Sequence, residues 1–391
     1  MRFAARRNLC SAMLTVAALL ASGPLTGQSV EIVPGTKTGF ASVTESARLL
    51  SVRDAFVAAM SPFDRAARLK TDRDVTEAEY LAFVARQTLE WTDPEVVALA
   101  AILERFRKAT GDLDLRLPPV VLFIKTTGLE EGRAAYCRGS SVVLPVNVIG
   151  GDPAELEKTV VHELFHIYSR NHPEKRAAFY GILGFEVCSE VALPESLRSR
   201  KITNPDAPRI DSVIHVRIGH DTDRRPVTPV LLATSDRYDV QRGGEFFASM
   251  EFRLLVLDGS DGVFRPAARP DGGPQLLDPG AVPDYLDQIG RNTRYVIHPE
   301  EILADNFVLL IQGTKPVQTP GILEQMRPLL TKRRRTLRRR SCWRLRRRAL
   351  PPSRLRRSPE AATPAAWRSR RPSSRPGSRA ARARRPPSSG S

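Results

Sequence analysis

The sequence feature that most constrains this chain is the segment His162-Glu-Leu-Phe-His166. Asp152-Pro-Ala-Glu155 has the pattern of a capping box, so we predict a helix that begins there and ends just before Pro173. Residues four apart lie on one face of a helix, so both imidazoles can reach one metal ion, with Glu163 beside it. Two of the six histidines of the chain lie on this one face, and the segment therefore predicts a zinc site.

Zinc at such a site supports hydrolysis. It lowers the pKa of a bound water toward 7, and the carboxylate of Glu163 can take the proton and deliver it to a leaving amine. We therefore predict Zn²⁺ as the cofactor and Glu163 as the general base. A catalytic zinc has three protein ligands and one open position, so a third ligand is needed.

Two segments compete for the third ligand. Glu301-Ile-Leu-Ala-Asp305 falls on a predicted helix, where Glu301 can bind zinc and Asp305 can fix the tautomer of a ligand imidazole. His172 is the alternative, because it has the spacing of the third histidine in HExxHxxGxxH, although Ser169 replaces the glycine. We favour Glu301 over His172, and further carboxylates remain open as ligands: Glu186, Glu190, Glu245 and Glu251.

HExxH followed much later by ExxAD resembles the gluzincin metallopeptidases, in particular the family whose membrane members process prenylated proteins and whose soluble periplasmic relatives act in protein quality control. The resemblance implies a zincin-like fold with zinc ligands His162, His166 and Glu301. It also implies Glu163 as the general base and Asp305 as the hydrogen-bond partner of a ligand imidazole. The spacing to His172 resembles the metzincins and is the weaker alternative. Because 134 residues separate His166 from Glu301, we expect an inserted β-rich region over residues 194–290.

Two further residues precede the second segment. Tyr295 and His298 could donate a hydrogen bond to the charge that develops on a substrate carbonyl oxygen, and we predict them as catalytic residues. The alternative is that Tyr295 only packs and that His298 caps the helix that begins at Pro299. We assign no role to His215 or His220.

The patterns in residues 30–330 predict an α+β fold. We expect a small mixed sheet with helices on its two sides, the active-site helix among them, together with the β-rich region. Capping boxes at residues 76–79 and 92–95 predict two more helices. Pro145 favours an edge position for the strand at 140–147, where an extended peptide could pair. The predicted strands are residues 119–126, 140–147, 212–218, 228–234 and 246–257.

Residues 1–29 have the basic, apolar and small-residue parts of a signal peptide, which predicts export to the periplasm or outside the cell. No run of about 20 apolar residues follows, so we expect no membrane-spanning body. In the exported body, Cys137 and Cys188 could form a disulfide or remain two separate thiols, and the sequence fits both.

The net charge of +17 comes from the end of the chain. Residues 331–391 contain 22 basic residues and one acid, whereas residues 30–330 contain 35 basic and 42 acidic residues. We predict a disordered Arg/Pro/Ser-rich tail, and interpret it as a frameshift or read-through product because its residues have GC-rich codons. A tail that binds nucleic acid or lipopolysaccharide is the alternative, although an exported hydrolase has little use for a nucleic-acid arm.

Together these features predict an exported zinc metallopeptidase whose domain spans residues 30–330 and whose substrate is a protein or peptide. The alternative is a zinc-dependent hydrolase or binding protein on the same scaffold without protease activity. The sequence predicts neither the oligomeric state nor the cleavage specificity.

Overall fold

The computed structural model describes residues 29–219 and 222–331. The predicted signal peptide up to Gln28, His220 and the basic tail beyond Thr331 lie outside these residues. Within the described part, no helix is long and apolar enough to cross a membrane.

The first sheet is mixed. Its order is β1 (Glu31–Val33), β2 (Thr36–Phe40), β4 (Val120–Thr126), β6 (Ser141–Pro145) and β5 (Tyr136–Arg138), and β3 (Thr88–Leu89) also pairs with β4. Strands β2, β4 and β6 run parallel, which requires cover on both faces of the sheet. The side chains of β4 alternate between the two faces, so that Val121 and Phe123 pack into one core cluster and Ile124 into another.

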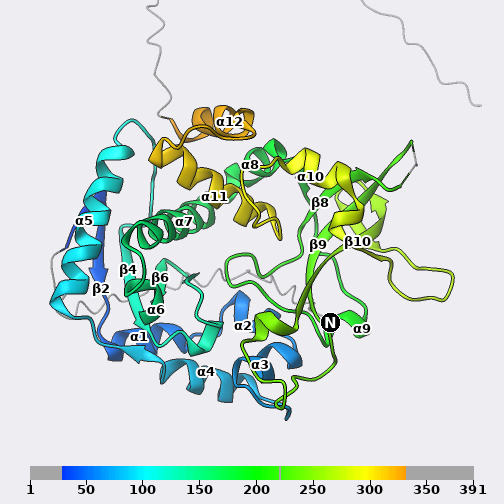
Figure 1. Ribbon diagram of the computed structural model, residues 1–391, viewed down its shortest axis with the longest axis horizontal. Coiled ribbons are helices and arrows are strands. Elements are labelled where there is room, and N and C mark those ends of the chain that lie inside the picture. The colour runs from blue at the N-terminus through cyan, green and yellow to red at the C-terminus, as the bar shows by residue number, and fades with distance from the viewer. Residues whose placement is uncertain (1–28, 220–221, 332–391) are drawn as a thin grey trace, which may run out of the picture. The chain divides into compact units, whose positions relative to one another are not determined.

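Helices cover both faces of this sheet (Figure 1). On the side of Phe123 lie α5 (Asp93–Ala109) and α7 (Pro153–Asn171), and the side of Ile124 is covered by α1 (Val43–Leu50), α2 (Ala55–Ala59) and α4 (Glu77–Ala85). The structure confirms the α+β class and the predicted capped helices. Further elements of this half are α3 (Pro62–Arg68), α6 (Val146–Ile149) and the 3₁₀ turns η1 (Leu129–Glu131) and η2 (Pro173–Lys175).

The prediction that the strand at 140–147 is an edge strand was wrong. β6 lies between β4 and β5, and the short β5 is at the edge. Pro145 is the last residue of β6. The pairing with β5 begins two residues earlier, where Val143 pairs with Tyr136, so Pro145 lies beyond the part of β6 that pairs with β5. A missing N–H therefore costs no bond to β5.

The second sheet is antiparallel, and all of its strands except β7 come from the segment predicted to be β-rich. Its order is β11 (Val263–Pro266), β10 (Met250–Ser260), β9 (Arg224–Ala233), β8 (Ser212–Arg217) and β7 (Phe185–Val187), and β12 (Leu276–Leu277) pairs with β10. Residues 246–249, predicted as strand, form the 3₁₀ turn η3 (Phe246–Ser249) instead. The short helical elements of this region are α9 (Glu195–Arg198), η4 (Pro279–Ala281) and α10 (Pro283–Ile289).

Between the two sheets lie α7 and α11 (Pro299–Gln312), near the centre of Figure 1. The ring centroids of Phe165 on α7 and Phe307 on α11 are 5.4 Å apart. Residues of both helices and of β8, β9 and β10 share one hydrophobic cluster, so the two sheets enclose a common core. The remaining helices, α8 (Arg176–Ile182) and α12 (Pro320–Leu330), pack beside α11.

Candidate metal centre

Helix α7 carries the first part of the candidate site. The carboxylate of Asp152 accepts hydrogen bonds from the backbone of Ala154 (2.7 Å) and Glu155 (3.2 Å), which fixes the start of the helix as the sequence predicts. Two turns later, His162 and His166 lie on one face with ring centroids 4.7 Å apart. His166 is buried and His162 is partly exposed.

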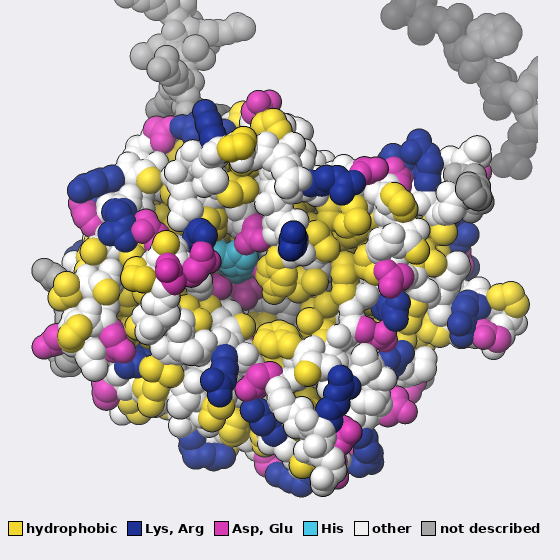
Figure 2. All heavy atoms as spheres, in the orientation of Figure 1, with side chains coloured by type: hydrophobic (Ala, Val, Ile, Leu, Met, Phe, Trp, Pro, Cys, Tyr) yellow, Lys and Arg dark blue, Asp and Glu magenta, His cyan; other side chains and the backbone are white. Residues whose placement is uncertain are grey.

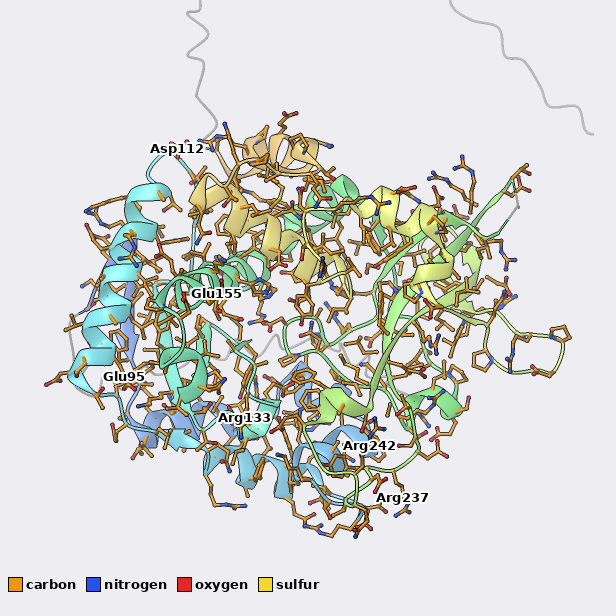
Figure 3. The ribbon with its side chains drawn as sticks, viewed as in Figure 1. Glu95, Asp112, Arg133, Glu155, Arg237 and Arg242 are labelled. Atoms are coloured by element: carbon orange, nitrogen blue, oxygen red, sulfur yellow. The ribbon has the colours of Figure 1, made fainter. Side chains whose placement is uncertain are left out.

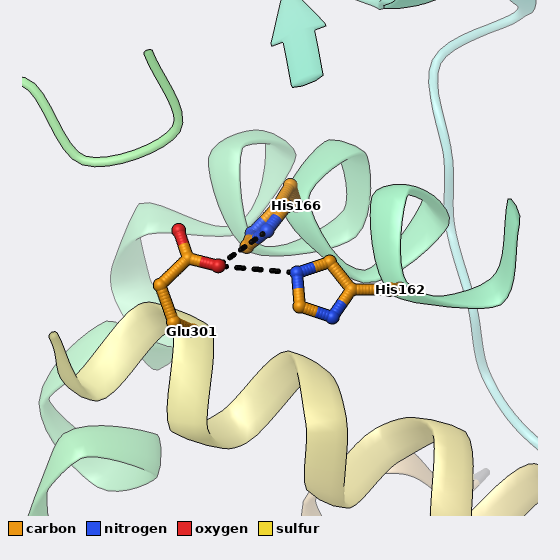
Figure 4. A group of neighbouring side chains, drawn as sticks. All are labelled: His162, His166 and Glu301. Carbon is orange, nitrogen blue, oxygen red and sulfur yellow. Dashed lines mark hydrogen bonds and ion pairs between the residues drawn. The ribbon is translucent and has the colours of Figure 1, made fainter. Parts of the chain in front are cut away.

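Helix α11 brings Glu301 to these two rings (Figure 4). Glu301 Oε2 is 3.1 Å from His162 Nε2 and 3.5 Å from His166 Nε2. Tetrahedral zinc with bonds of 2.0–2.1 Å separates its ligand atoms by about 3.3 Å, so this spacing fits a zinc ion. His166 Nε2 is buried and has no hydrogen-bond partner in the described chain, as expected of a nitrogen reserved for a metal. The three side chains could therefore hold a metal ion.

Carboxylates also face the other nitrogens of both rings. His162 Nδ1 is 2.9 Å from Asp305 Oδ1, and Thr293 donates to the second oxygen of Asp305. His166 Nδ1 is 3.4 Å from Glu300 Oε1. A proton held on Nδ1 by a carboxylate leaves Nε2 free to bind a metal.

The charges around the site favour a cation. Burial alone lowers the pKa of His162, but hydrogen bonds to Asp305 and Glu301 outweigh it and raise the pKa to about 9. The same carboxylates that stabilise a proton on the imidazole stabilise a metal ion in its place.

Two residues that hold this arrangement, Glu300 and Asn204, were not predicted from the sequence. Glu300 accepts hydrogen bonds from Ser169 and Tyr180, both at 3.0 Å, in addition to facing His166. Ser169, which breaks the metzincin pattern, is therefore part of the support for His166. Asn204 donates to Glu301 Oε1 at 2.6 Å and leaves Oε2 to face the histidines. Glu300 has a weak signal in the sequence, its place next to Glu301, and Asn204 has none.

His172 does not join the group. It ends α7, where its Nδ1 is 2.8 Å from Glu174 and its Nε2 is 2.7 Å from the carbonyl oxygen of Arg116. The other carboxylates considered as third ligands, Glu186, Glu190, Glu245 and Glu251, are also outside the group of His162, His166 and Glu301.

Glu163 is 3% exposed and lies beside a second group of polar side chains. Cys137, on the edge strand β5, donates its thiol hydrogen to Glu163 Oε2 at 3.1 Å. Asp206 accepts from the backbone N–H of Cys137 at 3.1 Å and from Arg170 at 3.3 Å. Burial, with the Asp206 carboxylate nearby, raises the pKa of Glu163 to about 7. Both Cys137 and Cys188 are free thiols in this structure.

Tyr295 and His298 occupy different surroundings. Tyr295 is 42% exposed, and its ring centroid is 6.4 Å from that of His162. His298 caps α11, because its Nδ1 accepts from the backbone N–H of Glu300 at 3.1 Å. Burial lowers the pKa of His298 to about 4, so the ring is neutral at physiological pH.

A cavity of about 710 Å³ opens onto the site and is lined by His162, Glu163, Glu301 and Tyr295. In Figure 2 the histidine is visible at the bottom of a hollow, with acidic and apolar side chains around it. Glu155, on the first turn of α7 (Figure 3), also lines the cavity. His298 is not among the residues that line it.

Fold and site together define an α+β protein with a candidate metal centre of two histidines and one glutamate, set in an open cavity. Comparisons of the chain with family models, with curated proteins and with solved structures found no match.

Proposed function

We propose that this protein is an exported zinc-dependent metallopeptidase whose catalytic domain spans residues 30–330. The observation that carries the proposal is the spacing of His162 Nε2, His166 Nε2 and Glu301 Oε2, together with a buried carboxylate, Glu163, beside them. Export is inferred from the signal-peptide pattern of the sequence alone.

Zinc held by His162, His166 and Glu301 would supply a Lewis acid that polarises water and a substrate carbonyl. Glu163 takes the proton of the attacking water and returns it to the leaving amine. A pKa near 7 suits a group that must both accept and donate a proton at neutral pH. Tyr295, at the same cavity, donates to the carbonyl oxygen. His298 positions Glu300 and Glu301 through the start of α11.

Exchange of the third ligand tests the metal centre. We expect the full chain with Glu301→Gln to lose stoichiometric zinc, because a neutral amide is a much weaker zinc ligand than a carboxylate. His172→Gln should keep one zinc per chain, since both nitrogens of His172 already have partners in the protein. The measurement is metal analysis after dialysis against apo buffer. Zinc lost from His172→Gln and kept by Glu301→Gln would reverse the assignment.

Glu300 gives a second, smaller effect. Glu300→Gln should weaken zinc binding by about 10- to 100-fold, because the carboxylate that orients His166 becomes a neutral amide. A competition titration with a coloured chelator measures it. Glu186→Gln is the matched control, as Glu186 is exposed and bonded to His215. Equal affinities of the two variants would show that Glu300 does not support the centre.

A further inference from the structure

The cavity at the candidate metal centre has two unlike walls. One carries His162, Glu163 and Glu301, and the other is apolar. Figure 2 shows this apolar surface next to the histidine. We call it the apolar wall; its residues come from the loop after α9, from β9, η3 and β10, and from the loop before α11: Ile202, Leu231, Phe246, Phe247, Met250 and Ile297.

The pairing of β9 with β10 places two of these side chains. Met250 pairs with Ala233, and Phe252 pairs with Leu231. Because side chains alternate along a strand, Leu231 and Met250 point to the same face of the sheet, the one that faces the cavity. These two side chains pack against a hydrophobic cluster that contains Ile202 and Phe246 of the wall and also Phe63 and Tyr238, which do not line the cavity. The wall therefore has a packed backing.

The aromatic pair of the wall is also fixed in place. The ring centroids of Phe246 and Phe247 are 4.1 Å apart, and the guanidinium of Arg68 lies 4.3 Å from the centroid of Phe246. A Cβ on Gly132 would stand 2.6 Å from the ring of Phe247, so a larger residue there would displace the ring. Phe247 nevertheless remains 41% exposed. An aromatic surface held in this way is ready for an apolar ligand without rearrangement.

The opposite wall indicates which apolar ligand fits. It carries Glu163, Asp206, Glu301 and Asp305, and Lys158 is the only Lys or Arg among the described lining residues. These carboxylates tolerate the neutral backbone of a peptide. Tyr136, the first residue of the edge strand β5, lines the cavity together with Ala134 and Ala135, so an extended peptide can lie beside this end of the edge. The next residue, Cys137, already donates its backbone N–H to Asp206.

We propose that the apolar wall binds one large apolar side chain (Phe, Leu or Met) of an extended peptide, next to the bond that the metal centre cleaves. The proposal deepens the proposed function and rests on it for the reaction, but not for the binding. The cavity volume of about 710 Å³ lies within the range of pockets that enclose whole ligands, so it can hold such a side chain and its neighbours.

Binding to an inactive variant tests the proposal without cleavage. The probes are two fluorescently labelled decapeptides that differ only in a central Phe or Ala, and the protein is the zinc-loaded full chain with Glu163→Gln. Fluorescence anisotropy should show that the Phe peptide binds about tenfold tighter or more, the value expected for burying a phenyl side chain. Equal affinities would overturn the proposal.

Changes in the wall locate the site. Phe247→Ala, at a half-exposed position, should reduce the preference for Phe about threefold or more, and Leu231→Trp should abolish it by covering part of the apolar wall. The matched control is Val263→Ala on β11, which is exposed and does not line the cavity. Thermal unfolding of each variant verifies that it is folded. A preference unchanged in folded Phe247→Ala and Leu231→Trp would overturn the assignment.

The two proposals can fail separately. Phe-selective binding without cleavage by the wild-type chain would keep the apolar wall as a peptide site and remove the peptidase. Cleavage of both peptides at equal rates with equal binding would keep the peptidase and remove the role of the wall. Tight binding of fluorescently labelled dodecanoate, with equal binding of the two peptides, would replace the peptide by an acyl chain and overturn the proposal.

Discussion

Glu163→Gln is expected to lower the rate of hydrolysis of a denatured protein substrate by about 10²- to 10⁴-fold while the chain keeps one zinc ion. Glutamine has nearly the same shape but cannot accept the proton of the attacking water. The ligand atoms on His162, His166 and Glu301 are untouched by the change. Single-turnover cleavage measured beside metal analysis separates the two effects.

The control for this change is Glu157→Gln on the same helix. Glu157 pairs with Arg105 at the surface and lies outside the cavity, so activity should stay at the wild-type value. Full activity of Glu163→Gln would remove Glu163 as the base. Loss of zinc from Glu163→Gln would instead assign the carboxylate a part in holding the metal.

Arg68→Leu is expected to cost about 3–5 kcal/mol in the free energy of unfolding. Arg68 is fully buried between two carboxylates, with Nη1 2.6 Å from Asp64 and Nη2 2.5 Å from Glu131. Without the guanidinium, two buried carboxylates face each other with no cation. Burial already raises the pKa of Glu131 to about 7 against the opposing effect of Arg68. Urea unfolding followed by circular dichroism measures the loss.

An exposed ion pair provides the comparison. Arg73→Leu removes the partner of Glu79 at 2.8 Å on the surface and should cost at most about 1 kcal/mol. Similar small losses for Arg68→Leu and Arg73→Leu would mean that water reaches the Arg68 cluster. Arg68 also donates to the carbonyl oxygen of Thr203, next to Asn204, so the variant should lose metal affinity as well.

Local patterns in the sequence were enough to predict α7 and the start of α11. Capping residues and the i, i+4 spacing are properties of one helix. They place His162, Glu163 and His166 close together on that helix without any knowledge of the fold. The approach of Glu301 required the assumption that two distant helices meet, which came from the resemblance rather than from spacing. The α+β class followed from the run of strands and helices.

The residues that sequence reasoning missed lie on other kinds of structure. Asn204 and Asp206 come from a loop, where no periodicity indicates which side chains face a site. Cys137 was weighed as a disulfide partner or a separate thiol but not as a neighbour of the site, whereas its thiol bonds to Glu163. The position of Pro145 was misread because its meaning depends on where the neighbouring strand ends, and that is a property of the sheet rather than of the strand.

The ligands of the candidate centre come from α7 and α11, which meet only in the folded chain. An ion held there would join His166 to Glu301 across the 134 residues between them and would act as a reversible cross-link. Since an unfolded chain offers no such arrangement, zinc at 100 times its dissociation constant would add about 2.7 kcal/mol to the stability of the fold. The lifetime of the folded chain would then depend on the zinc available to it as much as on its own packing.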